Sequence, residues 1–553
     1  MLDFAHAAGA IAGTTSTLAK RRTLADYLRG LPEPELRRAA IFMTGQPYGR
    51  AERRTLQLGW ATIGHVVERL SGRSPEELRE LYRDHGDVGD WARDALRGRT
   101  HPAPATLTQL ATALDGIADA QGQAEKERLL TELLDRLDEE SVRFLVKVLT
   151  YELRIGLQEG LVEAAIAAAF EVPPATVRRV HMVTGDLGET AVRCARHDLD
   201  DIRLTLFQPF RFMLATPVED PEEAFRRMRR ERLWTEEKYD GVRCQLHRDA
   251  ARAALFSRDL RETTDAFPEL AEAAAALDRD LVLDGEVLAY RGDRVAPFFD
   301  LQRRLGRKQV SAKLRREVPV VLVAFDLLSL DGELLTELPL GERRRRLEAL
   351  QLRWPFLLAR VEEAGTTAEL DRIFEETRAR GNEGLMVKDP ASAYLPGRRG
   401  MAWLKVKRPL ATLDAVVTTV EWGHGKRHGV LSDYTFAVLD EESGELRNVG
   451  KAFTGLTDVE IAEMTAWFLD HTIADYGHAR AVEQTVVVEV AFDSIQRSSR
   501  HRSGYALRFP RIVRLRPDKP VAEIDTVSRV DELFRHYFDR YPPLAEVAET
   551  ERA

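Results

Sequence analysis

The sequence reads Glu236-Glu237-Lys238-Tyr239-Asp240-Gly241-Val242-Arg243 near its middle, a stretch with one lysine among charges of both signs. Asp240-Gly241 is typical of a hairpin turn, and the alternation of apolar and polar residues from Val242 onward predicts a strand. Lys238 is therefore expected where a strand meets a turn, which is a rigid position for a nucleophile. A Lys-x-Asp-Gly pattern alone is a weak signal, so its interpretation depends on the residues downstream.

Size and composition limit the class of protein. A chain of 553 residues predicts about three to four domains. No apolar run approaches the ~18 residues of a membrane span, so we expect no membrane partner. Two cysteines, Cys194 and Cys244, are too few for a disulfide framework or a four-cysteine zinc site and fit a reducing cytoplasm. The net charge of −9 argues against indiscriminate binding of polyanions but allows a local basic surface.

The pattern of apolar residues changes twice along the chain. Residues 1–207 are predicted to be all helix, with a turn at Leu153–Leu157 where backbone amides and Arg154 could face a phosphate. Residues 208–408 alternate strands and helices, and the apolar run at Val318–Leu328 predicts a strand buried on both faces. Residues 409–553 hold five strand candidates, which suit a closed barrel of the OB type. The expected fold is therefore multidomain: an all-α domain, an α+β domain and a C-terminal β-barrel.

The middle region carries the residues that a nucleoside triphosphate requires. Cations bind phosphates, separated carboxylates hold hydrated Mg²⁺, and an aromatic ring stacks on a base. In Trp403–Lys407 the period of two places Trp403, Lys405 and Lys407 on one face and directs Leu404 and Val406 into a core. The set comprises Lys238, Arg243, Arg258, Glu286, Phe325, Glu383, Trp403, Lys405 and Lys407.

Attack by Lys238 on the α-phosphorus requires a neutral amine. An ordinary lysine has a pKa of ~10.4, so bringing it near neutrality costs roughly 3–4 kcal/mol of ammonium destabilisation. Neighbouring cations such as Arg243, Lys405 and Lys407 are a physically sensible source of that cost. Glu286 and Glu383 oppose it unless they bind a metal, so we expect the first chemical step to require a divalent metal.

At this point the chain resembles the ATP-dependent DNA ligases of the three-domain type. The ordered motifs are Glu236-x-Lys238-x-Asp240-Gly241-x-Arg243, Ser257-Arg258, Asp284-Gly285-Glu286, Ala324-Phe325-Asp326, Glu383–Lys388, Trp403–Lys407 and Arg516-Pro517-Asp518-Lys519, flanked by Pro396–Gly400 and Gly504–Pro510. The resemblance covers essentially the whole chain. It implies a helical DNA-binding domain (1–207), an adenylation or nucleotidyltransferase domain (208–408) and an OB-fold domain (409–553).

The resemblance also implies roles for single residues. Lys238 becomes the catalytic lysine that carries AMP. The ATP-binding residues are Glu236 and Phe325 at the adenine, Arg243, Arg258 and Glu286 at ribose and phosphate, and Arg399, Lys405, Lys407, Arg516 and Lys519 at the phosphates. The metal residues are Glu286 and Glu383, and the DNA-binding residues are Arg154, Gly156, Lys426 and Arg427.

The implied reaction is the sealing of nicks in duplex DNA, in replication, repair or recombination. Its cofactors are ATP and Mg²⁺ or Mn²⁺, and its partner is nicked double-stranded DNA. We expect a monomer in the cytoplasm, at the bacterial nucleoid.

Two alternatives stay open. The chain could be another lysine nucleotidyltransferase, either an RNA ligase or a capping-type guanylyltransferase, although neither explains 200 helical residues upstream. It could also be a catalytically silent DNA-binding protein. Use of NAD is disfavoured, because NAD-type ligases carry a zinc module that two cysteines cannot build. Among the remaining features, Trp403 is interpreted as packing, and the run Arg343–Arg346 as a solvated helix face rather than a DNA clamp.

Overall fold

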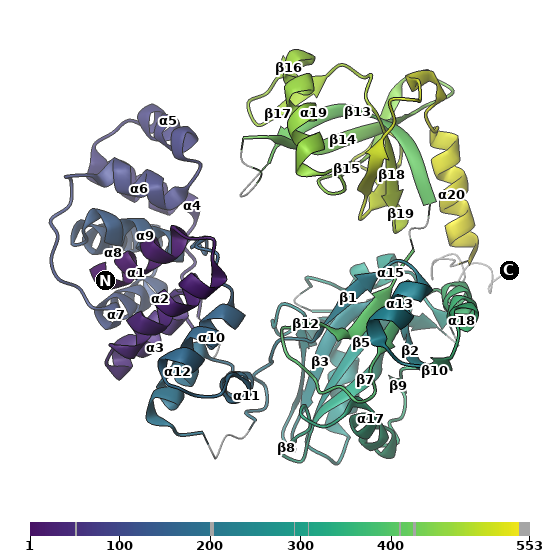
Figure 1. The fold of residues 1–553 in the computed structure, drawn as a ribbon, viewed down its shortest axis with the longest axis horizontal. Helices are drawn as coiled ribbons and strands as arrows, with labels where there is room; N and C mark the ends of the chain where they lie inside the picture. The colour runs from purple at the N-terminus through teal and green to yellow at the C-terminus, as the bar shows by residue number, and fades with distance from the viewer. Residues whose placement is uncertain are drawn as a thin grey trace. The chain divides into compact units, whose positions relative to one another are not determined.

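The computed structural model describes residues 1–49, 52, 54–199, 204–291, 294–307, 309–408, 411–423, 427 and 429–540. They divide into two compact units, one formed mainly by residues 1–212 and the other mainly by residues 213–553 (Figure 1). Within these described ranges, no helix is long and apolar enough to cross a membrane.

The first unit is helical, as the sequence predicts. Several of its helices begin at a side chain that caps the free backbone amides of the first turn; Ser74 and Thr106, for example, each form a reciprocal capping box. The helices are α1 (Leu2–Ala12), α2 (Thr17–Arg29), α3 (Glu33–Phe42), α4 (Trp60–Ser71), α5 (Pro75–His85), α6 (Val88–Leu96), α7 (Leu107–Asp119), α8 (Gln123–Asp135), α9 (Glu139–Leu149), α10 (Glu159–Ala169), α11 (Pro174–Thr184) and α12 (Leu187–Arg196).

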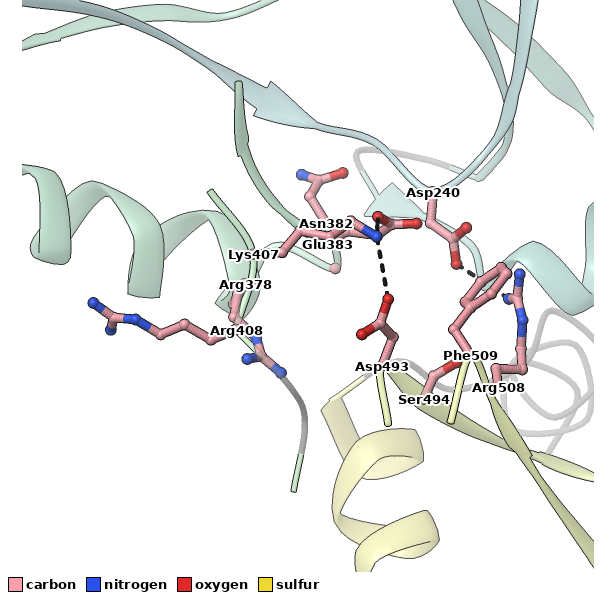
Figure 2. A pocket seen from close by; sticks show the side chains of 11 residues that line it. Asp240, Arg378, Asn382, Glu383, Lys407, Arg408, Asp493, Ser494, Arg508 and Phe509 are labelled. Atoms are coloured by element: carbon pink, nitrogen blue, oxygen red, sulfur yellow. Dashed lines mark hydrogen bonds and ion pairs between the residues drawn. The ribbon is translucent and has the colours of Figure 1, made fainter. Parts of the chain in front are cut away.

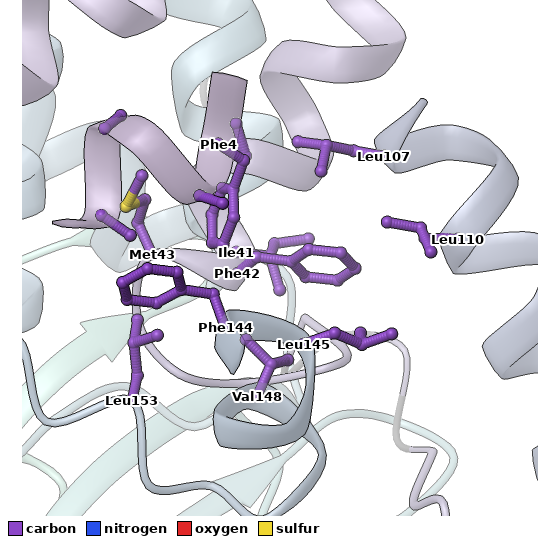
Figure 3. Packing of buried hydrophobic residues seen from close by; sticks show 14 of the residues in the cluster. Phe4, Ile41, Phe42, Met43, Leu107, Leu110, Phe144, Leu145, Val148 and Leu153 are labelled. Atoms are coloured by element: carbon purple, nitrogen blue, oxygen red, sulfur yellow. The ribbon is translucent and has the colours of Figure 1, made fainter. Parts of the chain in front are cut away.

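One continuous core holds these helices together. Phe4 and Phe42 meet edge to face with ring centroids 6.1 Å apart, and Phe144 of α9 lies in the same cluster (Figure 3). Leu153 also enters this cluster, although it belongs to the loop between α9 and α10. The loop is therefore anchored to the core by its own apolar residues.

The central part of the second unit consists of two sheets with helices. A five-stranded sheet has the order β1-β12-β11-β2-β10, and a seven-stranded sheet has the path β4-β3-β5-β7-β8, with β6 beside β5 and β9 beside β7. The strands are β1 (Leu214–Val218), β2 (Leu233–Lys238), β3 (Val242–Arg248), β4 (Ala253–Ser257), β5 (Leu281–Arg291), β6 (Arg294–Val295), β7 (Val320–Leu330), β8 (Glu333–Leu334), β9 (Phe356–Leu358), β10 (Val361–Ala364), β11 (Gly384–Lys388) and β12 (Arg399–Val406). The helices are α13 (Pro221–Met228), α14 (Pro268–Ala275), α15 (Phe298–Gln302), α16 (Ala312–Glu317), α17 (Leu340–Ala349) and α18 (Thr367–Ala379).

The turn at Asp240-Gly241 is not a hairpin, which corrects the prediction from sequence. β2 pairs with β10 and β11 in one sheet, whereas β3 pairs with β4 and β5 in the other. The short connection therefore carries the chain from one sheet to the next. Gly241 is needed there for space, because a Cβ atom would lie 2.3 Å from the carbonyl oxygen of Val287.

The arginine run Arg343–Arg346 also differs from expectation, because it is not a solvated face throughout. Arg343 lies on α17 with its side chain fully buried, and its guanidinium donates to both carboxylate oxygens of Asp326, at 2.7 and 2.8 Å. Arg344 is buried too and donates to the carbonyl of Ala359 at 2.9 Å. Only the second half of the run fits the prediction, with Arg345 well exposed.

The C-terminal part of the second unit is rich in strands, as predicted. One sheet has the path β15-β14-β13-β17-β16, and β18 joins β13 to β21. The elements are β13 (Ala411–Trp422), β14 (Leu431–Leu439), β15 (Leu446–Ala452), α19 (Asp458–Asp470), β16 (Thr472–Asp475), β17 (Ala479–Val482), β18 (Val487–Phe492), β19 (Ser494–Arg497), β20 (Tyr505–Arg508), β21 (Arg511–Leu515) and α20 (Val527–Arg540). The OB-type barrel and the domain boundaries at 207 and 408 stay predictions.

Candidate active site

Lys238 is the last residue of β2, at the point where the chain leaves the five-stranded sheet. Its ammonium Nζ lies 2.5 Å from Oε2 of Glu383. The backbone holds the two residues together, because the amide of Glu383 donates to the carbonyl of Lys238 at 2.8 Å and Gly384 pairs with Lys238 in the sheet. Glu383 is therefore fixed as the direct carboxylate partner of the lysine.

A second lysine shares that carboxylate. Lys407 also forms an ion pair with Glu383. Burial by itself raises the pKa of Glu383, but the charges of Lys238 and Lys407 outweigh burial and hold the pKa below its usual range. Two cations thus neutralise one carboxylate, and Glu383 is ionised at neutral pH.

Lys405, the third lysine, lies in a strongly cationic environment. Burial, and then the charges of Lys407, Lys238 and Arg399, lower the pKa of its ammonium. This is the crowding of cations that the sequence predicts around the nucleophile. It disfavours additional positive charge here and favours a polyanion such as a triphosphate.

Glu286 on β5 is the second acid near Lys238. Burial raises its pKa to about 8, although Lys238 and Arg243 act in the opposite direction. Within the described residues, no group of three His, Cys, Asp or Glu side chains forms a ready metal site. Mg²⁺ binds through one or two carboxylates together with water and substrate phosphates. Glu383 is already ionised, and the charge of a bound metal would favour ionisation of Glu286 as well.

A buried ion pair lies two residues before Lys238 along β2. Lys388 donates to Oε2 of Glu236 at 2.5 Å, and Trp234 Nε1 donates to Oε1 of the same carboxylate at 3.2 Å. The Lys388 ammonium also lies 4.5 Å from the ring centroid of Phe325 and 4.2 Å from that of Trp403. Glu236 is therefore a rigid acceptor beside an aromatic surface.

Phe325 and Trp403 differ in how deeply their rings are buried. Phe325 is less buried than the residues around it in β7, whereas Trp403 is almost fully buried and meets Phe325 edge to face at 6.4 Å. This burial supports the packing interpretation of Trp403, which stays a prediction because the residue also lines the cavity described below. Phe325 keeps a surface that a flat base could cover.

Arg243 is held by a network that the sequence does not reveal. Its guanidinium donates to both oxygens of Asp284, at 3.0 and 2.7 Å, and to the carbonyl of Met213 at 2.8 Å. The hydroxyl of Tyr394 donates to Asp284 at 2.7 Å and accepts from the amide of Met213 at 3.0 Å. Asp284 and Tyr394 are both buried, so these contacts fix the position of Arg243.

These groups surround one cavity of about 860 Å³, a size within the range of small-molecule sites. Arg258 follows β4 and Arg399 begins β12, and both side chains are exposed at its edge. The lining contains all the predicted ATP-binding and metal residues of the central part: Glu236, Arg243, Arg258, Glu286, Phe325, Glu383, Arg399, Lys405 and Lys407, together with Lys238.

Residues of the C-terminal part also reach this region (Figure 2). Lys407 donates to Asp493 at 3.3 Å, and Arg508 lies 3.5 Å from Asp240. Burial, and then repulsion from Glu383, raise the pKa of Asp240, while Arg508 opposes the rise. Sequence reasoning assigned no role to Asp240 or Asp493; for Asp240 the signal was its place in the lysine motif.

Arg516 and Lys519 are not among the residues that line the cavity. Both bind Asp414 instead: Arg516 at 2.8 and 3.0 Å, and Lys519 at 2.6 Å. Arg516 also donates to Asp518. The two cations are thus gathered at one place by a shared carboxylate, outside the cavity.

The predicted DNA-binding residues lie on both units. Arg154 and Gly156 are in the loop before α10, where Arg154 pairs with Glu152 at 3.0 Å. Arg427 donates to the carbonyl of Phe453, and Lys426 lies outside the described residues.

The chain is similar to known proteins along most of its length. It matches the families described as "DNA ligase N terminus" over residues 1–167, "ATP dependent DNA ligase domain" over residues 212–407 and "ATP dependent DNA ligase C terminal region" over residues 427–519. It is 46% identical to a "Probable DNA ligase" of Koribacter versatilis, with 96% of each chain covered. It is 36% identical to a "DNA ligase" of Archaeoglobus fulgidus, with 97% of this chain and 99% of the relative covered.

A solved structure described as "Pmar-Lig_PreS3" shares the fold, with a TM-score of 0.60 over 93% of this chain and 99% of that one. At 17% identity, this likeness supports the fold alone. Membership of a family is shown instead by the family matches and by the two relatives. This chain belongs to the family of ATP-dependent DNA ligases.

Proposed function

We propose that this DNA ligase seals nicks in duplex DNA through a covalent bond between Lys238 and AMP. The observation that carries the proposal is the position of Lys238 in a cavity of about 860 Å³, beside two further lysines and two carboxylates. As a member of its family, the enzyme uses ATP and acts on DNA. We further propose that it works as a monomer in the cytoplasm, at the nucleoid.

In the first step, Nζ of Lys238 bonds to the α-phosphorus of ATP while the bond to the bridging oxygen breaks and pyrophosphate leaves. Lys405, Lys407 and Arg399 line the cavity and would hold the phosphates. The lysine must first lose its proton, and the ion pair with Glu383 at 2.5 Å opposes that loss. Magnesium bound by Glu286 and Glu383 would compete with this ion pair and neutralise phosphate charge.

Glu236 and Phe325 would select the base. The carboxylate of Glu236 is held by Lys388 and Trp234, so it can only accept hydrogen bonds. The exocyclic amino group of adenine is a donor, whereas guanine presents a carbonyl acceptor at the corresponding position. This favours ATP over GTP and so argues against a guanylyltransferase.

The later steps transfer AMP to DNA. An oxygen of the 5′-phosphate attacks the AMP phosphorus, the phosphorus–nitrogen bond breaks and Lys238 regains its proton. The 3′-hydroxyl then attacks the 5′-phosphate, the DNA strand is joined and AMP leaves. The protein contributes mainly positioning and charge stabilisation to these steps.

The test is mass spectrometry of the full chain after incubation with ATP and magnesium. We expect one adenylate on the peptide that contains Lys238, and none in the variant Lys238→Ala. Lys313→Ala is the matched control, because Lys313 is a solvated lysine of the same domain, with 81% of its side chain exposed. An adduct on Lys238→Ala would place the nucleophile elsewhere.

A second measurement separates the alternatives. A singly nicked duplex is incubated with ATP, GTP or NAD, and the joined strand is resolved on a denaturing gel. We expect joining with ATP. Label from GTP alone would indicate a guanylyltransferase, and binding of the nick without joining would indicate a silent DNA-binding protein.

A further inference from the structure

Lys20, a residue of α2, is a buried cation whose hydrogen-bond partner is a backbone carbonyl. Only 7% of its surface is exposed, and its ammonium donates to the backbone carbonyl of Ile155 at 2.5 Å. Within the described part of the chain, no carboxylate lies within ion-pair distance of it. Lys147 in the same unit shows the usual arrangement, because it pairs with Asp87 at 2.7 Å. A buried charge without a carboxylate is costly, and this charge lies against the loop that carries two of the predicted DNA-binding residues, Arg154 and Gly156.

The hydrogen bond from Lys20 fixes one peptide group. The carbonyl of Ile155 and the amide of Gly156 belong to the same peptide, and in a trans peptide these two groups point in opposite directions. Since the carbonyl is turned inward to Lys20, the amide of Gly156 is turned outward. Gly156 is exposed, so its amide is available to an external acceptor.

Neighbouring amides are also free. Among the described residues, the amides of Gly156, Leu157 and Gln158 have no hydrogen-bond acceptor. The first turn of α10 follows at once, without a side-chain cap from Gln158, and a helix N-terminus favours negative charge. Free amides therefore gather at one short segment.

The loop is built to keep this shape. Leu153 and Ile155 are buried on either side of Arg154, while Arg154 and Gly156 adopt positive φ angles of 46° and 70°. Amides beside such left-handed residues form concave anion sites. A Cβ atom on residue 156 would lie 2.4 Å from Nζ of Lys20, so glycine is needed for the lysine to approach.

We propose that Lys20 is a positioning residue for DNA binding: it turns the Ile155–Gly156 peptide so that the Gly156 amide, together with Arg154, binds one phosphate of the DNA backbone. The ammonium lies directly behind this peptide and adds positive charge to the site. The inference rests on the proposed function, because it takes nicked DNA as the ligand.

The experiment uses the full chain and the variant Lys20→Met, which keeps the length of the side chain but removes its charge. The dissociation constant for a fluorescent nicked duplex is measured at several salt concentrations. We expect about a tenfold weaker affinity, and a salt slope of log K that is smaller by about one because one phosphate contact is lost. Self-adenylylation with ATP should proceed at the wild-type rate.

Lys126→Met is the matched control. Lys126 is a lysine of the same unit with 9% of its surface exposed, and it donates to the carbonyl of Leu56 at 3.3 Å rather than to a carbonyl of the Leu153–Leu157 turn. We expect this variant to bind the nick as the wild type does, whatever its effect on the melting temperature. Equal losses of affinity in the two variants would mean that Lys20 acts only through general stability, and would overturn the proposal.

A double-mutant cycle with Arg154→Ala gives the sharpest result. If both residues act on one phosphate, Lys20→Met/Arg154→Ala should bind about as weakly as either single variant and with the same salt slope. Additive losses, or unchanged binding by Lys20→Met, would refute the inference. Failure of the wild type to form an adduct with ATP would instead refute the proposed function, since DNA binding is measured separately.

Discussion

The ion pair between Asp326 and Arg343 allows a quantitative prediction. Both side chains are 0% exposed, and the guanidinium donates to the two carboxylate oxygens at 2.7 and 2.8 Å. Arg343 also donates to the carbonyl of Ser392 at 3.1 Å. In the variant Arg343→Met, the buried carboxylate keeps, among the residues that the structure describes, only the amide of Leu327 as a donor, at 3.0 Å. The substitution thus leaves an almost unpaired charge in the core.

Breaking a buried pair from one side costs about 3–5 kcal/mol of unfolding free energy. For a domain of this size, 1 kcal/mol shifts the melting temperature by about 2–4 °C, so the transition of Arg343→Met should fall by on the order of 10 °C. Circular dichroism at increasing temperature measures this change. The apparent KM for ATP should rise as well, because Asp326 directly follows Phe325, which lines the cavity that we propose to bind ATP.

Arg345→Met is the control for Arg343→Met. Arg345 lies on the same helix with 76% of its side chain exposed, and a surface substitution of this kind changes stability by about 0.5 kcal/mol or less. The double variant Asp326→Leu/Arg343→Met should recover much of the loss, because it removes both charges. Identical melting of the Arg343 and Arg345 variants would refute the reasoning.

Three further predictions concern the site. Burial raises the pKa of Glu286 from its ordinary value of 4.5 to about 8, so the wild type should lose unfolding free energy relative to Glu286→Gln as pH rises between these values. Parallel pH profiles of the two proteins in denaturant titrations would disprove this. Removal of divalent metal by EDTA should abolish the AMP adduct on Lys238, because Glu383 then retains the lysine ammonium at 2.5 Å. Mass spectrometry of the intact protein should then show the mass of the unmodified chain. An undiminished adduct would argue against the metal requirement. In the variant Arg516→Ala, formation of the AMP adduct should be slower by about tenfold, which is equivalent to ~1.4 kcal/mol. The variant enzyme should still join a nick whose 5′-phosphate is already adenylylated. Loss of both activities would assign Arg516 a structural role.

The sequence predicted the order and type of the main elements because their apolar patterns are strong. The apolar strand β7 (Val320–Leu330), for example, lies where the apolar run at Val318–Leu328 predicted a buried strand. It did not predict the course of the chain at Asp240-Gly241. There the local preference for a hairpin is overridden by pairing with strands that come later in the sequence. β2 pairs with β11 in one sheet, and β3 pairs with β5 in the other.

The contacts between buried polar side chains could not be predicted from the sequence either. In the sequence, Arg343 cannot be distinguished from the other arginines of its run. Only the fold brings it into contact with Asp326, which lies 17 residues earlier. The same holds for Asp284 and Tyr394, which are 110 residues apart. A charged residue is usually solvated, so the burial of a charged side chain cannot be predicted from sequence unless the residue that pairs with it in the fold is known. The roles of the candidate site residues stay predictions, although the structure brings Lys238, Glu383 and Lys407 into direct contact.

The ion pair between Lys238 and Glu383 has a consequence for the enzyme at rest. A protonated amine has no lone pair to offer, so acyl phosphates and other electrophiles of the cell meet an inert group. The lysine is thereby protected from accidental acylation until its proper substrate arrives. The nucleophile that we propose must be highly reactive once in each turnover, and this ion pair would let it survive undamaged between turnovers.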